Sequence, residues 1–296
     1  MPIVRTLGRR LKTIAWKLRL YWSLIKSLQS GLLLMTGVAG YLSAHAGFHA
    51  GSFAQMAVSL FLAISGSTIL NMWWDRDIDS RMKRTHMRPT PAGNVSPGEV
   101  AVLGSAVSLI GLAWAFLLEP RYGAVVFAGW FFDVVIYTVW LKRRTCWSIV
   151  WGGVAGSMPI LAGRVLAVGG MDAIGALLAA SVLFWIPTHT LTFSLKFYDD
   201  YRSAGVPTFP STYGVAVTRV AIALASILAG LAMSSAAVWI GVSEGILALI
   251  IFLSAVLLFM AAIVLFRPSD RMNLRLYRYA SIYMLSTMLL LIPGRL

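Results

Sequence analysis

"NMWWDRDIDSRMKRTHMRPTPAG", residues 71–93, places three aspartates and five Lys or Arg residues directly after a long apolar run. The whole chain has 296 residues, of which only 12% are charged and only 11 are acidic. A mixture of carboxylates and cations this dense, at the end of an apolar segment, indicates that both kinds of charge are needed there.

The apolar run before this stretch is one of several that recur along nearly the whole chain. Hydrophobic residues make up 58% of the sequence, and the mean hydropathy is +0.78. Apolar runs of about 18 residues or more are typical of transmembrane helices, which pair their backbone polar groups internally. We therefore predict an all-α integral membrane protein, a single domain over 1–296, with nine helices around a central cavity capped by cytoplasmic-side loops. The predicted spans are 20–44, 52–73, 98–119, 122–141, 148–169, 174–195, 216–241, 245–266 and 274–293.

The distribution of Lys and Arg predicts the orientation. With the N-terminus in the cytoplasm, 22 of the 25 Lys and Arg residues fall on the cytoplasmic side, as the positive-inside rule requires. This asymmetry accounts for most of the net charge of +14 without a nucleic-acid partner. The basic, amphipathic residues 1–19 predict an interfacial segment and not a signal peptide. The single cysteine, Cys146, excludes an intrachain disulfide.

The first polar loop has the pattern of a metal and anion site. Asn71, Asp75 and Asp79 are spaced i, i+4, i+8, so a helix that continues past the membrane edge presents all three on one face. Asp77 lies about 200° around the helix and need not point with them. Carboxylate and amide oxygens suit Mg²⁺, which commonly keeps substrate phosphates as further ligands. The other reading is that these acids only neutralise a positive loop and end a helix.

The second polar loop, "KFYDDYRSAGVPTFPSTYG" (196–214), repeats this mixture. Asp199 and Asp200 are adjacent and cannot both face the same way on a helix. Either could hold a second Mg²⁺ or bridge to the cations of the first loop; alternatively they cap the next element. "AGVP" and "TFP" are expected to break the helix.

Polar residues inside the predicted spans are functional candidates because charge is costly there. Asp133 could bond an acceptor or act as a base, or pair with an Arg or a hydroxyl for structure. Arg164 could bind an anionic group or extend to the outer interface. His189 could contact an acceptor or be a hydrogen-bonded structural residue. Lys26, near the cytoplasmic mouth, could touch a diphosphate bound at the first polar loop, and topology alone would also place it there.

Four stretches carry a resemblance to a known family. They are "LYWSLIKSLQSGLLLMTGVAG" (20–40), "NMWWDRDIDSRMKRTHMRPTPAGNVSPGE" (71–99), "YTVWLKRRTCWSIVWGGVAGSMPILAG" (137–163) and "FWIPTHTLTFSLKFYDDYRSAGVPTFP" (184–210). Together they resemble the UbiA superfamily of intramembrane prenyltransferases, and within it the protoheme IX farnesyltransferase (haem O synthase) branch.

The resemblance implies an enzyme with Mg²⁺ as cofactor and farnesyl diphosphate and haem b as substrates. Mg²⁺ and cations would stabilise the departing diphosphate, and a haem vinyl group would capture the allylic cation. The candidate metal ligands and catalytic residues are Asp75, Asp79, Asp199 and Asp200, with Asn71 as a further metal ligand. The candidate substrate-binding residues are Asn71, Arg76, Arg81, Lys83, Arg84, Arg88, Lys26, Lys142, Lys196, Tyr201, His189, Asp133 and Arg164.

Two alternatives remain at this point. A member of the same superfamily could use another acceptor, such as an aromatic acid, a quinone precursor or a glycerol lipid. From a different class, a secondary transporter for an anionic solute would need polar or broken helices near the middle of the membrane.

Overall fold

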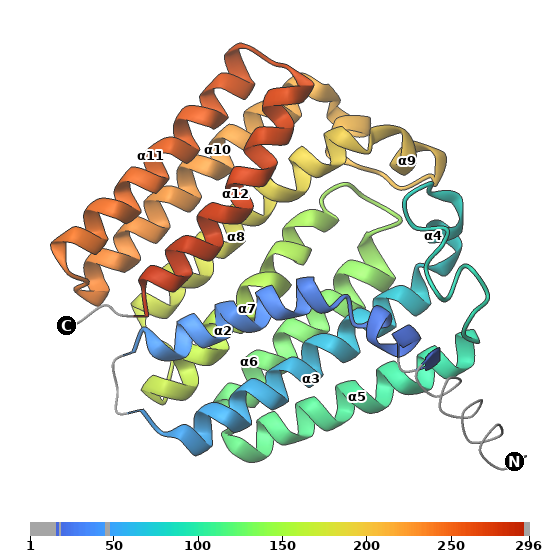
Figure 1. The fold of residues 1–296 in the computed structure, drawn as a ribbon, viewed down its shortest axis with the longest axis horizontal. Coiled ribbons are helices and arrows are strands. Elements are labelled where there is room, and N and C mark those ends of the chain that lie inside the picture. Colours follow the sequence, from blue (N-terminus) through green and yellow to red (C-terminus); the bar gives the residue numbers. More distant parts are fainter. Residues whose placement is uncertain (1–15, 18, 45–47, 293–296) are drawn as a thin grey trace, which may run out of the picture.

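The fold comes from a computed structural model that describes residues 16–17, 19–44 and 48–292. All the regular elements in these residues are helices (Figure 1). They are α2 (Ser27–Leu42), α3 (Ala50–Trp74), α4 (Arg76–Arg81), α5 (Pro97–Leu118), α6 (Pro120–Phe131), η1 (Phe132–Leu141), α7 (Ser148–Val168), α8 (Ala173–Lys196), α9 (Tyr198–Ser203), α10 (Phe209–Ile240), α11 (Glu244–Phe266) and α12 (Asp270–Leu290). The predicted interfacial segment 1–19 falls mostly on residues outside this description.

Seven of the nine predicted spans are long and apolar enough to cross a membrane: α3, α5, α6 with η1, α7, α8, α10 and α11. The chain is thus an all-α, multi-pass membrane protein. The predicted first span is interrupted, because Lys26 takes a left-handed backbone conformation (φ 45°) and leaves only 16 residues in α2. The last predicted span corresponds to α12, which carries Asp270 and three arginines.

The second polar loop breaks at one predicted place and not at the other. Helix α9 ends at Ser203, and Gly205 follows in the left-handed region (φ 70°), as "AGVP" predicts. "TFP" instead begins α10. Thr208 and Ser211 form a capping box there, and Pro210 lies in the first turn, where its missing N–H has no partner to lose.

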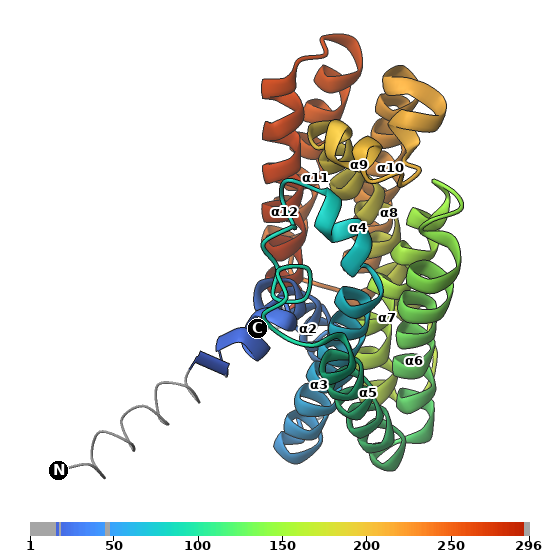
Figure 2. The same ribbon diagram turned by 90° about the vertical axis from the view of Figure 1, so that its right-hand side faces the viewer.

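The two halves of the chain share one local design. Helix α3 ends at Asp75 and is followed by the six-residue α4; α8 ends at Phe197 and is followed by the six-residue α9. Helix α3 packs on α5 as α8 packs on α10. Both views show the short helices side by side at one end of the bundle (Figures 1 and 2). This end brings together the two polar loops that the sequence singles out.

Glycines allow α2 and α7 to pack backbone against backbone. A Cβ on Gly40 would overlap the carbonyl oxygen of Ile160, and one on Gly163 would overlap that of Gly37. Small residues at such contacts are the usual means of close helix packing in membranes. The contact fixes α2, and with it the position of Lys26 at its start.

An ion pair closes the end of the bundle opposite α4 and α9. Arg164 is 5% exposed, and its guanidinium donates to both carboxylate oxygens of Asp172 and to the backbone oxygen of Ser43. Asp172 also accepts from the backbone N–H of Gly175, which caps α8. Arg164 is therefore held inside the protein, and the expectation that it extends to the outer interface is wrong.

Gly40→Ala should lower the melting temperature of the detergent-solubilised protein. The added methyl has no room beside Ile160, and overpacking typically costs about 1–3 kcal/mol. Gly31→Ala, on the same helix with open space around it, is the matched control and should be neutral or slightly stabilising. Equal melting temperatures for the two variants would contradict the close α2–α7 contact.

Asp172→Asn should destabilise the protein at neutral pH by about 1–3 kcal/mol, because it leaves the buried Arg164 guanidinium without its charged acceptor. Burial acts to raise the pKa of Asp172, but hydrogen bonds from Arg164 and Gly175 outweigh it and hold the pKa below its usual value. A lowered pKa means that the stabilisation exists above the unfolded pKa of about 3.9 and is lost as the pH falls through the folded value. The difference in melting temperature between wild type and Asp172→Asn should therefore shrink below about pH 4. A difference independent of pH would argue against the ion pair.

Candidate active site

One face of α3 and α4 carries a row of polar residues at intervals of four: Ser67, Asn71, Asp75 and Asp79. Helix α3 ends at Trp74, yet the Asp75 N–H bonds the Asn71 oxygen at 2.9 Å and the Asp79 N–H bonds the Asp75 oxygen at 2.8 Å. The i to i+4 pattern thus continues through the helix boundary. Asn71, Asp75 and Asp79 share one face, as their spacing predicts.

A second polar row on η1 faces the first. Ser67 donates to Asp133, Asn71 donates to Thr138 at 2.9 Å, and Lys142 pairs with Asp75. These three contacts join α3 to η1 at successive turns, and we call them the α3–η1 polar ladder. The contact at Ser67 is the end of the ladder farthest from α4. Ser67 lies eight residues before Asp75, which is about 12 Å along the helix axis.

The π-helical geometry of η1 makes this ladder possible. Asp133 and Lys142 are nine residues apart, which is about two and a half turns of an α-helix, so they would face opposite ways. In η1 the backbone bonds run from i to i+5, as from the Lys142 N–H to the Tyr137 oxygen (2.8 Å). The wider turns bring Asp133, Thr138 and Lys142 to the same side of the helix.

Cations from three segments meet the acidic row. Lys142 pairs with Asp75, Arg88 bonds Asp79 at 2.7 Å, and the Lys26 ammonium lies 3.1 Å from the amide oxygen of Asn71. Asp75 is 2% exposed and Asp79 5%, so both carboxylates are buried beside positive charge. One carboxylate oxygen of Asp75, Oδ1, is buried without a hydrogen-bond partner among the described residues.

Asp77 points away from this row. Both of its carboxylate oxygens accept from Arg143 at 2.7 Å, and Arg143 also donates to the backbone oxygen of Trp74. The bond from Arg143 holds the pKa of the exposed Asp77 carboxyl below its usual value. The expectation that Asp77 need not join the others is confirmed, because Asp77 instead pairs with Arg143, just after η1.

The two polar loops are in contact. Ile78 and Met82 of the first pack in one apolar cluster with Ala204, Val206 and Tyr201 of the second. Arg84 lies over the rings of Phe193 (4.8 Å) and Phe197 (5.2 Å) near the junction of α8 and α9. The two polar loops therefore lie side by side at one end of the bundle (Figures 1 and 2).

The carboxylates of the second loop are less enclosed. Asp199 is exposed and Asp200 half-buried. Within the described residues no three His, Cys, Asp or Glu side chains are grouped closely enough to hold a metal ion. Lys196 lies over the ring of Phe197 at 5.0 Å. The first loop thus supplies the compact part of the site, and the acids of the second loop lie nearer its surface.

Other predicted residues lie apart from the acidic row. Arg76 donates to the Trp73 backbone oxygen, and Arg81 and Lys83 are exposed. His189 stacks on Trp185 (5.0 Å) and makes a tilted contact with Tyr277 (4.4 Å), and its Nδ1 lies 3.1 Å from the Ser281 hydroxyl. This half-buried imidazole among flat aromatic rings belongs to the α8–α12 side of the bundle.

Sequence reasoning missed Thr138 and the Asp77–Arg143 pair. Thr138 is fully buried and reads as an ordinary small residue of an apolar span. The π-helical register aligns Thr138 with Asn71, and the residue types in this span do not predict a π-helix. The pairing of Arg143 with Asp77 had one available signal, which is that Arg143 directly follows Lys142 at the end of the same span.

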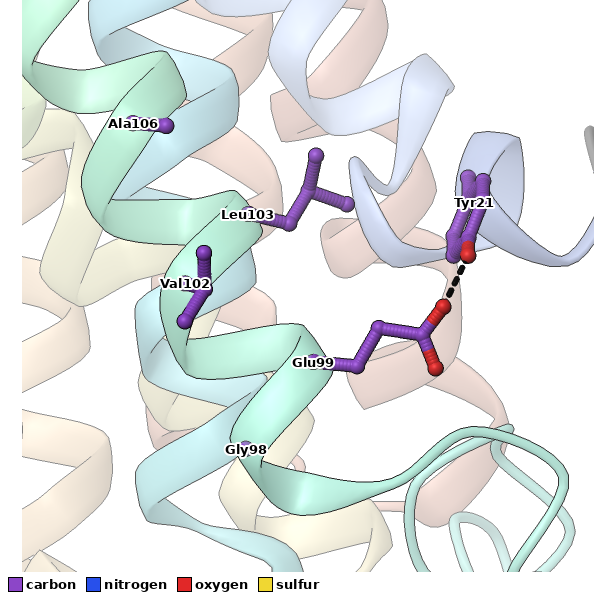
Figure 3. Close-up of a pocket in the computed structure, with 6 residues that line it drawn as sticks. All are labelled: Tyr21, Gly98, Glu99, Val102, Leu103 and Ala106. Carbon is purple, nitrogen blue, oxygen red and sulfur yellow. Dashed lines mark hydrogen bonds between the residues drawn. The ribbon is translucent and has the colours of Figure 1, made fainter.

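An apolar groove lies away from this site (Figure 3). It has a volume of about 470 Å³ and lies between the segment before α2 and the first turns of α5. The Tyr21 hydroxyl donates to Glu99 at its rim. Its lining residues are Tyr21, Gly98, Glu99, Val102, Leu103 and Ala106. None of them belongs to the α3–η1 polar ladder.

Sequence comparison finds close relatives. Residues 32–285 match the UbiA prenyltransferase family. The protoheme IX farnesyltransferase of Archaeoglobus fulgidus is 42% identical over 268 residues, covering 90% of this chain and 94% of that protein. The protoheme IX farnesyltransferase of Ruegeria pomeroyi is 41% identical over 214 residues, covering 71% of this chain and 67% of that protein.

Solved structures share the fold at low sequence identity. A digeranylgeranylglyceryl phosphate synthase superposes with a TM-score of 0.79 at 18% identity, covering 94% of this chain and 98% of that one. A UbiA homologue from Archaeoglobus fulgidus bound to GPP and Mg²⁺ superposes with a TM-score of 0.69 at 15% identity, covering 92% and 99%. The match over residues 32–285 and the 42% identity over nine-tenths of the chain place this protein in the UbiA prenyltransferase family.

Proposed function

We propose that this protein transfers the farnesyl group of farnesyl diphosphate to haem b, giving haem O, with Mg²⁺ as cofactor. The observation that carries the proposal is the row of Asn71, Asp75 and Asp79 facing Lys26, Lys142 and Arg88. It occurs in a chain 42% identical, over nine-tenths of its length, to a protoheme IX farnesyltransferase.

The acidic row suits Mg²⁺ in its chemistry. Asn71, Asp75 and Asp79 offer one amide and two carboxylate groups, the hard oxygen donors that this ion prefers. The unpartnered Oδ1 of Asp75 supports the assignment, because a buried carboxylate oxygen without a partner is costly unless a ligand meets it. Asp199 and Asp200 would serve a second ion or the outer phosphate oxygens. When bound, Mg²⁺ would neutralise charge on the diphosphate.

The chain's own cations have a defined part in the reaction. The allylic C1–O bond of farnesyl diphosphate breaks, and diphosphate leaves with the electron pair. Arg88, Lys142 and Lys26 now hold Asp79, Asp75 and Asn71, and they would turn to the diphosphate oxygens as its charge grows. Cations already gathered in a site poor in water stabilise such charge strongly. The two polar loops supply further anion-binding candidates, which are Arg76, Arg81, Lys83, Arg84 and Lys196.

We assign the acceptor chiefly to the α8–α12 side of the bundle, where His189 lies. A vinyl carbon of haem b would attack C1 of the farnesyl cation, and water would add to the resulting carbocation and lose a proton. His189, between Trp185 and Tyr277, offers flat apolar surface and one ring nitrogen for haem. Tyr201 and Asp133 are further candidates. Arg164 is left out of this assignment, because its donors are engaged by Asp172 and Ser43.

We also propose nine membrane spans in one domain, with α2 and α12 added to the seven apolar helices. Helix α2 packs on α3 and α7, and α12 packs on α8 and α11. The cytoplasmic placement of α4 and α9 is supported by the count of Lys and Arg, 22 of 25 on that side.

Asp75→Ala and Asp79→Ala should each remove nearly all prenyl transfer, because each deletes a carboxylate of the proposed metal site. Asp77→Ala is the matched control. Its carboxylate bonds Arg143 instead, so it should keep most of the activity. The measurement is the rate of diphosphate release from farnesyl diphosphate by the purified variants. Near-normal rates for both Asp75→Ala and Asp79→Ala would overturn the metal assignment.

The acceptor is tested by incubating the purified protein with farnesyl diphosphate, Mg²⁺ and haem b. We expect diphosphate release together with a heavier haem in the mass spectrum. Release only with an aromatic acid, a quinone precursor or a glycerol lipid would move the protein to another acceptor. No turnover with any allylic diphosphate, alongside solute flux in liposomes, would favour an anion transporter.

A further inference from the structure

The orientation of the Asn71 side chain follows from its two neighbours. The Lys26 ammonium lies 3.1 Å from one end of the amide, and Thr138 Oγ1 lies 2.9 Å from the other. An ammonium has only donors, so the amide atom that faces it is the oxygen. The amide nitrogen therefore faces Thr138, whose hydroxyl oxygen accepts from it.

We propose that Thr138 is a positioning residue that holds the Asn71 amide with its oxygen toward the metal and diphosphate site. This inference rests on the function proposed above. Thr138 is fully buried and Asn71 is 9% exposed, so water cannot readily replace the hydroxyl as acceptor. Without that acceptor the amide nitrogen would keep an unpaired hydrogen in the interior, and the amide would gain by turning it toward the acidic row.

The need for an outside constraint is specific to Asn71. A carboxylate presents an oxygen whichever way it turns, so Asp75 and Asp79 can offer a ligand in either orientation. An amide offers oxygen at one end only and hydrogens at the other. Lys26 orients the amide in the structure described here. When a metal ion binds the Asn71 oxygen or diphosphate binds the Lys26 ammonium, Thr138 is the neighbour that continues to hold the amide.

The π-helix explains why a threonine of the apolar span can do this. Thr138 is the middle residue of the η1 row, between Asp133 and Lys142, and the ladder places it opposite Asn71. Partners that orient metal ligands from outside typically change metal affinity by about 10- to 100-fold when they are removed. Thr138 therefore belongs to the function of the site although it touches neither metal nor substrate.

The test compares Thr138→Val, which keeps the shape and removes the acceptor, with Thr138→Ser, which keeps the acceptor. Binding of Mn²⁺ in the presence of inorganic pyrophosphate is measured as protein-bound Mn²⁺ by equilibrium dialysis against the same pyrophosphate solution. We expect about tenfold weaker binding for Thr138→Val and binding within about twofold of wild type for Thr138→Ser. The Mg²⁺ concentration for half-maximal turnover should rise by the same factor, with the maximal rate largely kept.

Thr287→Val is the matched control for burying an extra methyl group in place of a hydroxyl. Thr287 is also fully buried, but its hydroxyl bonds only backbone oxygens of its own helix. This variant should bind Mn²⁺ like the wild type. If Thr138→Val does not purify as a folded protein, Thr138→Ala removes the same acceptor and must show the same weakening.

The outcomes separate this inference from the proposed function. If Thr138→Val or Thr138→Ala binds Mn²⁺ as tightly as the wild type, the role of Thr138 is overturned and the metal site stays in place. Equal weakening in Thr138→Ser also overturns it, because the hydroxyl is then not what matters. A wild-type protein that binds no Mn²⁺ with pyrophosphate overturns both.

Discussion

The site depends on placing the carboxylates of Asp75 and Asp79 beside positive charge in the interior of a largely apolar protein. An isolated carboxylate taken out of water is very costly and stays ionised only if opposite charge or donors surround it. Asp75 and Asp79 are buried, and each has its own cation, Lys142 or Arg88, brought from a different segment. The positions of η1 and of the loop after α4 are thus tied to the acids of α3 and α4. The same cations are then available at the place where an anionic substrate would need them.

Charge is unevenly divided between the two halves of the molecule. In the first half the residue between the long and the short helix is an aspartate, Asp75, and in the second half it is an aromatic residue, Phe197. The second half carries the stacked rings around His189, and Arg84 of the first half reaches across to Phe193 and Phe197. Ionic chemistry and flat apolar surface therefore meet at one end of the bundle but come from different helices.

Much of this arrangement could be predicted from the sequence. Apolar runs predict the helices, and spacings of four predict the shared face of Asn71, Asp75 and Asp79, because both depend only on local geometry. The composition of the two polar loops allows a bridge between them, and the structure shows the loops in contact through an apolar cluster. What could not be predicted depends on contacts between distant segments or on unusual backbone geometry. The burial of Arg164 by Asp172 and Ser43 is of the first kind. The left-handed break at Lys26 and the π-helical register of Thr138 are of the second.

The wide turns of η1 also restrict how the chain can vary in length. Each residue of this segment advances the side chains by less rotation than in an α-helix, and three contacts with α3 depend on the accumulated angle. Losing or gaining a single residue between Asp133 and Lys142 would turn the Lys142 side chain away from α3 and leave Asp75 without its counter-ion. Substitutions at the exposed Val139 and Trp140 would leave this angle unchanged. The spacing within this segment is therefore under stricter constraint than the identity of most of its residues.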